Sequence, residues 1–236
     1  MDFKAGEIFA IDKPYRMSSF GALAHVRYLL SHRLGYKVKI GHAGTLDPLA
    51  TGVLILCTGK ATKQIETLQT HTKEYVATLQ LGATTVSYDM EHPENATYPT
   101  EGITLASISE VIKQFVGDIE QVPPTYSAVK VNGDRAYQLR RDGQEVELKP
   151  KQVRIDEIEI LRFDEEGMKL QLRVVCGKGT YIRALARDLG RALNSGAYLT
   201  ELRRTRVGDY SVDNCVPFND FVAWMDENNI KKEIII

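Results

Sequence analysis

The chain contains the sequence Gly41-His42-Ala43-Gly44-Thr45-Leu46-Asp47-Pro48-Leu49-Ala50-Thr51-Gly52-Val53-Leu54, in which one carboxylate, Asp47, lies in a loop of Gly, Thr and Pro. An apolar run from Val53 to Cys57 follows at once and predicts a buried strand. Glycine permits turns that a side chain forbids, and Pro48 biases Asp47 away from helical conformation. A lone Asp-Pro is most often an ordinary turn. Read as a whole, the stretch indicates an acid that is held still and exposed for a chemical task.

Three further motifs accompany this loop. They are Ile11-Asp12-Lys13-Pro14-Tyr15-Arg16-Met17-Ser18-Ser19, Lys73-Glu74-Tyr75 and Cys176-Gly177-Lys178-Gly179-Thr180-Tyr181-Ile182-Arg183. Together with Leu202-Arg203-Arg204 and residues 121–141, they follow the order found in the TruB-type tRNA pseudouridine synthases. That family also contains the archaeal and eukaryotic box H/ACA enzymes. The chain resembles it over roughly residues 7–207.

The resemblance implies an enzyme that isomerises uridine 55 in the T-loop of tRNA to pseudouridine, with Asp47 as the nucleophile. The reaction breaks the N1–C1′ bond and rejoins the base through C5, without redox change or cofactor. Asp47 would add to C6, attack C1′ or assist elimination to a glycal, and the sequence leaves these routes open. Each route needs an ionised carboxylate in a dry pocket, where burial raises its pKa and a nearby cation lowers it. Arg183 is the candidate cation; the alternative is a surface arginine in the first turn of a helix.

The resemblance also implies which residues contact the substrate. Tyr75 would stack on the target base and relay a proton, and Tyr181 and Leu202 would line the same pocket. His42 would take the place of the flipped base in the RNA stack. Lys13 would support the active-site loop or contact phosphate. On pattern alone, Tyr75 is a core residue of a strand and His42 an ordinary loop histidine.

The remaining candidates are cations that could contact phosphate. They are Lys178, Arg203, Arg204 and Arg206, together with Lys130, Arg135, Arg140 and Arg141 from the segment 126–151. In the family this segment is an insertion that clamps the RNA loop. We expect it to be mobile without RNA and ordered with it; the alternative is an ordinary hairpin surface.

The pattern of elements predicts an α+β protein. Strands and helices alternate without a strict βαβ rhythm, and the resemblance implies a pseudouridine synthase fold: a central mixed, mostly antiparallel sheet flanked by helices. We expect strands at 7–12, 73–81, 153–162 and 168–176, and helices from Ser18 or Ser19 to Leu34 and at 62–70, 104–116, 180–194 and 218–226. Residues 84–102 read as a surface excursion.

The length of 236 residues fits one large domain or two small ones. We expect a catalytic domain over 1–210, with the RNA clamp at 126–151 inside it. Residues 211–236 would form a short tail rather than a complete C-terminal PUA domain.

The net charge of −1 argues at first against a nucleic-acid partner, but the charge is unevenly distributed. Residues 1–63 carry nine Lys or Arg against four Asp or Glu, and residues 178–206 carry seven against two. The compensating acids lie at 86–120 and 156–166. This segregation predicts a basic face for phosphate contact and an acidic face, with solvated helix surfaces as the plainer alternative.

Several classes of protein are disfavoured. The three cysteines, Cys57, Cys176 and Cys215, form no Cys-x-x-Cys pair, which disfavours a disulfide framework or a zinc site. No apolar run approaches ~18 residues, and no signal peptide is visible. The segment Thr58-Gly59-Lys60-Ala61-Thr62 fails the phosphate-loop pattern twice. With the family resemblance, which implies binding of the tRNA T-arm and no cofactor, we expect a cytoplasmic monomer that uses no metal or membrane.

Two positions depart from the family pattern. Arg16 stands where Gly is usual, which puts the local backbone and the exact role of Lys13 in question, and Ala43 stands where Thr is common. A catalytically silent RNA-binding protein or tRNA-folding chaperone is the alternative function. The joint retention of Asp47, Tyr75 and Arg183 favours the enzyme.

Overall fold

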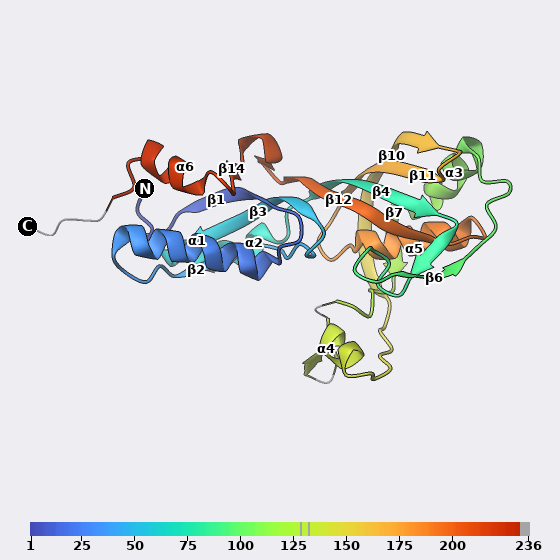
Figure 1. Cartoon of the computed structure of the whole chain (residues 1–236), viewed down its shortest axis with the longest axis horizontal. Helices are drawn as coiled ribbons and strands as arrows, with labels where there is room; N and C mark the ends of the chain where they lie inside the picture. The colour runs from blue at the N-terminus through green and yellow to red at the C-terminus, as the bar shows by residue number, and fades with distance from the viewer. Residues whose placement is uncertain (128, 132, 232–236) are drawn as a thin grey trace, which may run out of the picture. The chain divides into compact units, whose positions relative to one another are not determined.

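The computed structural model describes residues 1–127, 129–131 and 133–231, and it has the predicted α+β architecture. The chain forms two compact units: unit 1 comprises Met1–Glu74 and Arg203–Ile236, and unit 2 comprises Tyr75–Leu202. Strands β4 (Lys73–Leu81) and β12 (Ala197–Val207) contribute residues to both units. Each unit is described by itself below (Figure 1).

The sheet of unit 1 carries the predicted buried strand at its centre. Its strand order is β14-β1-β3-β12, with β2 paired to β3 and β13 paired to β12. The bounds are β1 Ile8–Lys13, β2 Ile40–His42, β3 Thr51–Thr58, β13 Tyr210–Ser211 and β14 Val216–Pro217. β1 runs antiparallel to β3, whereas β12 runs parallel to β3 and pairs Arg204 with Gly52. The Asp47 loop therefore leads directly into β3, and β3 is hydrogen-bonded to β1 on one side and to β12 on the other.

One long helix covers an apolar face of this sheet. α1 (Ser19–Leu34) begins after Ser18, whose side chain accepts a hydrogen bond from the Gly21 amide, and ends at Gly35 with φ 76°. Its buried residues pack with those of β1, β3 and α6 (Phe221–Glu227) in a core of Phe9, Ile11, Leu23, Val26, Leu30, Leu54, Leu56 and Phe221. The remaining helical turns of unit 1 are η1 (Gly59–Gln64), α2 (Ile65–Leu68) and η3 (Val212–Asn214). Of the helix predicted at 62–70, residues 62–64 are the end of the 3-10 turn η1 and Ile65–Leu68 form the short α-helix α2.

The sheet of unit 2 has the strand order β12-β4-β11-β10-β7, and β10 pairs antiparallel with both β11 and β7. The bounds are β7 Gly117–Gln121, β10 Lys151–Asp164 and β11 Lys169–Cys176. The helices are α3 (Leu105–Ile112), its 3-10 extension η2 (Lys113–Phe115), α4 (Ala136–Arg141) and α5 (Ile182–Ala192). Two small hairpins complete the unit: β5 (Ala83–Thr85) with β6 (Glu94–Thr97), and β8 (Lys130–Val131) with β9 (Asp134–Arg135). The predicted excursion at 84–102 therefore contains a strand pair.

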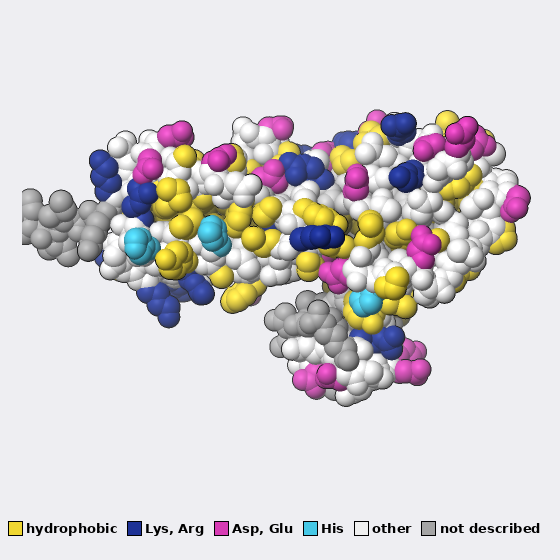
Figure 2. Space-filling view, viewed as in Figure 1, with side chains coloured by type: hydrophobic (Ala, Val, Ile, Leu, Met, Phe, Trp, Pro, Cys, Tyr) yellow, Lys and Arg dark blue, Asp and Glu magenta, His cyan; other side chains and the backbone are white. Residues whose placement is uncertain are grey.

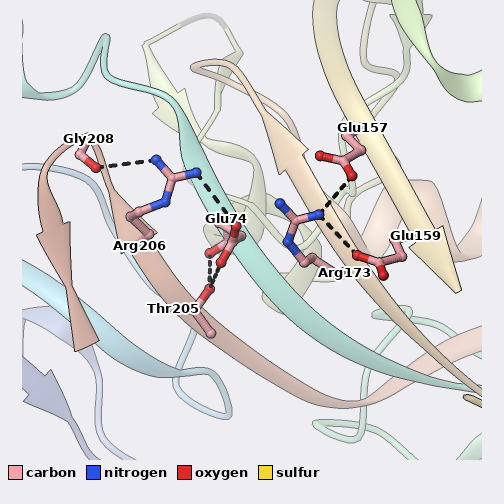
Figure 3. Close-up of polar contacts among 7 residues, drawn as sticks. All are labelled: Glu74, Glu157, Glu159, Arg173, Thr205, Arg206 and Gly208. Atoms are coloured by element: carbon pink, nitrogen blue, oxygen red, sulfur yellow. Dashed lines mark hydrogen bonds and ion pairs between the residues drawn. The ribbon is translucent and has the colours of Figure 1, made fainter. Parts of the chain in front are cut away.

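The charged side chains of unit 2 are partly paired across its strands. Arg173 on β11 donates to Glu157 at 2.9 Å and Glu159 at 3.1 Å on β10 (Figure 3). On the face seen in Figure 2, basic and acidic side chains are interspersed over much of the surface. No helix among the described residues is long and apolar enough to cross a membrane.

Candidate active site

Asp47 lies in the loop that joins β2 to β3 in unit 1. Its side chain is half-buried, between the buried Leu46 and the exposed Pro48. The Ala50 amide donates to the Asp47 carbonyl at 3.1 Å, which closes a tight turn just before β3. Ala43 is fully buried in the apolar cluster that includes Val53, so the start of the loop is packed into the core of the unit.

Lys13 ties this loop to the end of β1. Its side chain is fully buried, and its ammonium donates to the carbonyls of Pro14 at 2.8 Å, Met17 at 2.6 Å and Pro48 at 3.3 Å. The third of these acceptors is the residue next to Asp47. Of the two roles implied for Lys13, the contacts favour support of the active-site loop, because a buried ammonium with three carbonyl acceptors does not face a phosphate in solvent.

Ser19 holds the loop from a second side. Its hydroxyl donates to the Leu46 carbonyl at 2.9 Å and accepts from the Leu46 amide at 2.8 Å. The adjacent Ser18 caps α1. Ser18 therefore stabilises the start of the helix, whereas Ser19 holds the loop. The sequence showed only that one of them could be a cap; nothing local indicated the contact with Leu46, which lies 27 residues away.

Arg204 holds the loop from a third side, and this corrects the expectation that it contacts phosphate. Its side chain is 1% exposed and donates to the Val53 carbonyl at 2.8 Å and the Gly44 carbonyl at 3.0 Å. A Cβ on Gly52 would lie 2.1 Å from the Arg204 carbonyl oxygen, and Gly52 has φ 103°. The close parallel pairing of β3 and β12 thus requires glycine at position 52.

Two groups beside the loop have shifted pKa values. Burial lowers the pKa of Lys13 to about 8, while the carboxylate of Asp47 acts in the opposite direction. Burial, followed by the positive charge of Arg204, lowers the pKa of His42. The Nδ1 atom of His42 is buried without a hydrogen-bond partner in the described structure. A neutral imidazole beside the loop suits stacking or insertion better than phosphate pairing.

The Lys73-Glu74-Tyr75 motif is fixed by its first two residues. Lys73 donates to the carbonyls of Gln69 and His71, both at 2.5 Å. Glu74 accepts from the Thr205 hydroxyl at 2.8 Å and forms an ion pair with Arg206 at 3.5 Å (Figure 3). Both contacts set the position of β4 as it leaves unit 1. Tyr75 follows as the first residue of unit 2, and its side chain is 8% exposed.

Arg183 is buried, so the alternative of a surface arginine is wrong. Its side chain is 4% exposed near the start of α5, and it donates to the Ser87 carbonyl at 3.1 Å and the Tyr126 carbonyl at 2.9 Å. Asp89 forms an ion pair with it at 3.6 Å. A buried guanidinium needs such partners, because an uncompensated buried charge is strongly destabilising.

Asp89 was not found by sequence reasoning. It accepts from the Ser87 hydroxyl at 2.6 Å and from the Glu91 amide at 3.0 Å. These two hydrogen bonds fix the carboxylate in the position in which it pairs with Arg183. The residue lies in the segment expected to be a surface excursion, and no pattern there distinguished one acid from its neighbours.

The other pocket candidates lie at the ends of elements in unit 2. Tyr181 is half-buried immediately before α5, and its amide donates to the Gln121 side chain at 2.8 Å. Leu202 is half-buried on β12.

The expected phosphate contacts have different surroundings. Lys178 is exposed, whereas Arg203 pairs with Asp12 at 2.7 Å and Arg206 pairs with Glu74. Arg140 lines a pocket of about 810 Å³ in unit 2, with its guanidinium 5.9 Å from the centroid of the Tyr126 ring. The side chains of Lys130, Arg135 and Arg141 lie outside the described part of the structure. Within the described residues, no group of three His, Cys, Asp or Glu side chains could hold a metal ion.

Two family models match consecutive parts of the chain, from residue 31 to residue 235. Residues 31–182 match the model described as TruB family pseudouridylate synthase (N terminal domain). Residues 183–235 match the model described as tRNA pseudouridylate synthase B C-terminal domain.

Known proteins with similar sequences bear a consistent name. A tRNA pseudouridine synthase B from Bacteroides thetaiotaomicron is 58% identical over 236 residues, which cover 99% of this chain and 98% of that protein. One of the same name from Flavobacterium johnsoniae is 49% identical, over 93% of this chain and 96% of that protein.

Solved structures give the same fold. A Cbf5-Nop10-Gar1 complex contains a chain that is 30% identical with a TM-score of 0.72, covering 97% of this chain and 58% of that one. A chain in an H/ACA RNP bound to a substrate RNA containing 2'-deoxyuridine is 27% identical with a TM-score of 0.68, over 97% of this chain and 57% of that one.

Proposed function

This chain belongs to the TruB family of pseudouridylate synthases, and from that premise we propose that it converts uridine 55 in the T-loop of tRNA to pseudouridine, with Asp47 as the nucleophile. The observation that carries the proposal is the Asp47 loop, held by Lys13, Ser19 and Arg204 in a chain 58% identical to a tRNA pseudouridine synthase B. A nucleophile held in a fixed position reacts faster, because the entropy of orientation is lost before the reaction.

The reaction needs little from the protein besides a carboxylate and a fixed base. The N1–C1′ bond breaks and a C5–C1′ bond forms, while C5 loses a proton and N1 gains one. An ionised Asp47 serves any of the three routes: addition to C6, attack at C1′ or assistance to glycal formation.

We propose supporting roles for the other candidate site residues. Tyr75 stacks on the flipped uracil and Tyr181 and Leu202 line its pocket. Arg183 supplies the cation that keeps the nucleophile ionised, and Asp89 orients Arg183. His42 occupies the place that the flipped base leaves in the RNA stack.

We propose that RNA affinity comes from Lys and Arg side chains that contact phosphate. Lys178 and Arg203 would contact phosphate, as would Lys130, Arg135, Arg140 and Arg141 of the segment 126–151, which would close on the T-arm when RNA binds. Residues 1–210 would form the catalytic domain. The segment expected to be a short tail packs against this domain over its described residues, 211–231, because β14 joins the sheet of unit 1 and α6 packs in its core. The enzyme would act as a cytoplasmic monomer without metal or cofactor.

The test is tritium release from tRNA transcripts labelled at uridine C5. We expect the wild type to release one tritium for each tRNA, and the Asp47→Asn variant to release none. A tRNA with cytidine in place of the T-loop uridine should also release none. Thermal unfolding of Asp47→Asn at the wild-type temperature would show that the loss is chemical.

The alternative outcomes separate the parts of the proposal. Release that persists in Asp47→Asn would remove Asp47 as the nucleophile. Release from the cytidine-substituted tRNA would reject the site. Tight tRNA binding without release by the wild type would favour an RNA-binding protein or folding chaperone.

A further inference from the structure

We propose that the outward face of α1 and the loop before it form a second RNA-binding surface, which contacts unpaired nucleotides of the tRNA outside the target loop. The inference rests on the proposed function, in which tRNA is the substrate. We name this the α1 surface, and it consists of Tyr15, Arg16, Phe20, Arg27, Tyr28 and His32.

Its aromatic side chains are unusually exposed. Phe20 is 65% exposed, Tyr28 66% and Tyr15 48%. Phe20 and Tyr28 are eight residues apart in the helix and therefore lie on the same stripe. Tyr28 stacks on His32 with ring centroids 6.1 Å apart and planes at 27°. Exposed rings on one stripe offer stacking platforms for unpaired bases.

The charge of this region fits a polyanion. Residues 13–46 contain six Lys or Arg and no Asp or Glu. Lys13 is buried and Arg33 pairs with Asp226 of α6, which leaves Arg16, Arg27, Lys37 and Lys39 to set the local potential. In Figure 2, hydrophobic and histidine side chains cover α1, with basic side chains beside them and no acidic one among them. A protein partner would have to match both rings and cations, whereas RNA supplies bases and phosphates together.

Arg16 gives an independent reason. Its φ of 59° lies in the left-handed region, which glycine adopts easily and arginine does not. A strained residue that carries a long cation points to a function for that cation. The guanidinium lies 5.5 Å from the centroid of the Tyr15 ring, so the cation and an exposed ring are presented together.

The α1 surface begins beside the loop that carries Asp47. Lys13 binds the Pro14 and Met17 carbonyls on one side and the Pro48 carbonyl on the other. Ser19, the first residue of α1, binds Leu46. From there the 16 residues of the helix extend about 24 Å. RNA that presents a uridine to Asp47 therefore lies near the first turn of this helix, and the rest of the helix can reach nucleotides beyond the target loop.

The main test compares two RNAs. Binding to full-length tRNA and to an isolated T-arm hairpin is measured in the Asp47→Asn background, with Phe20→Ser and Tyr28→Ser added together. We expect the Kd for full-length tRNA to rise about tenfold or more, because each stacked base contributes substantially. The Kd for the hairpin should stay within twofold. Leu105→Ser, which removes an apolar side chain that is 54% exposed on α3, is the matched control and should change neither.

Arg16→Gly supplies a second readout that a structural role would not produce. Glycine relieves the backbone strain, so the melting temperature should not fall, yet tRNA binding should weaken. The salt dependence of log Kd should decrease by about 0.7, as expected for one lost phosphate contact with unpaired RNA.

Each contrary result overturns the inference. A change of less than twofold in the Kd for full-length tRNA would do so, and an equal loss on the hairpin would place the contact in the target loop instead. A concentration-dependent dimer that Phe20→Ser and Tyr28→Ser abolish would assign the surface to a second copy of this chain. A wild type without tritium release would defeat the proposed function, but the binding comparison would still decide this inference.

Discussion

At Gly52 two backbones lie so close that no side chain fits between them. A Cβ there would lie 2.1 Å from the Arg204 carbonyl oxygen, and the φ of 103° disfavours any L residue. We expect Gly52→Ala to lower the free energy of unfolding by roughly 3 kcal/mol or more, since clash and backbone strain add. Chemical denaturation measures this.

The control is Gly102→Ala, with φ 83° and no atom within 4 Å of the added Cβ. This variant adds backbone strain but no clash, and it should lower the free energy of unfolding by about 1 kcal/mol. Equal losses in the two variants would show that β3 and β12 separate easily.

From the lowered pKa of Lys13 we predict that stability and activity change in opposite directions with pH. Its folded pKa of about 8 lies below the ordinary 10.5, so between these values the folded state binds fewer protons than the unfolded state. Stability from this group therefore increases as the pH rises from 8 to 10.5, by about 3 kcal/mol in total. Activity should fall above pH 8, because the neutral amine has two protons for three carbonyls and no charge near Asp47.

Tritium-release rates from pH 6.5 to 9 and denaturation at the same pH values test both signs. Lys13→Arg keeps the charge and should remove the decline above pH 8. A wild-type rate that is flat across this range would reject the role given to Lys13.

Sequence reasoning found Asp47 and Arg183 because motifs carry them, but it did not find how they are held. Arg204 was expected to contact phosphate, like the other cations of its segment. It is buried because two carbonyls at the loop and in β3 face it, and those arise only from tertiary structure. Asp89 was missed for the same reason.

At the scale of elements, the first turn of α1 also supports the active-site loop. Ser19→Ala would leave the Leu46 amide and carbonyl without their partner in a buried setting, and we expect a loss of about 2 kcal/mol in stability. The catalytic rate should fall too, because the residue next to Asp47 is released.

Ser18→Ala is the matched variant one residue away. It removes the helix cap, which should cost about 1 kcal/mol, without touching the loop. Its kcat should equal that of the wild type. If both variants had the same kcat, the Ser19 contact would have no part in catalysis.

Elements with a clear period were predictable, and elements set by pairing were not. β4 alternates apolar and polar residues, and α1 and α5 show helical spacing, so their places follow from burial of one face. β12 was not predicted because its charged residues interrupt the alternation of apolar and polar residues that indicates a strand. Those charged side chains form hydrogen bonds with residues that are distant in sequence. β7 has a polar sequence because it is the edge strand of the sheet and is paired with β10 on one side.

At the scale of the whole molecule, two strands belong to both units. Glu74 and Tyr75 are consecutive in β4, and Leu202 and Arg203 are consecutive in β12. Unfolding of one unit must therefore fray strands of the other, and we expect a single cooperative thermal transition. Calorimetry tests this, since the calorimetric and van't Hoff enthalpies should agree. Two resolved transitions would show that the units unfold independently.

The Gly52 contact has a genetic consequence. The atoms that exclude a side chain at position 52 are the backbone N, C and O of residue 204, which every amino acid possesses. No replacement at 204 can therefore act as a suppressor of Gly52→Ala. The Arg204 side chain, by contrast, supplies only donors to two carbonyls, so a defect there leaves room for second-site revertants. In a selection for function, revertants of Gly52→Ala should restore glycine at position 52 and carry no compensating change at position 204.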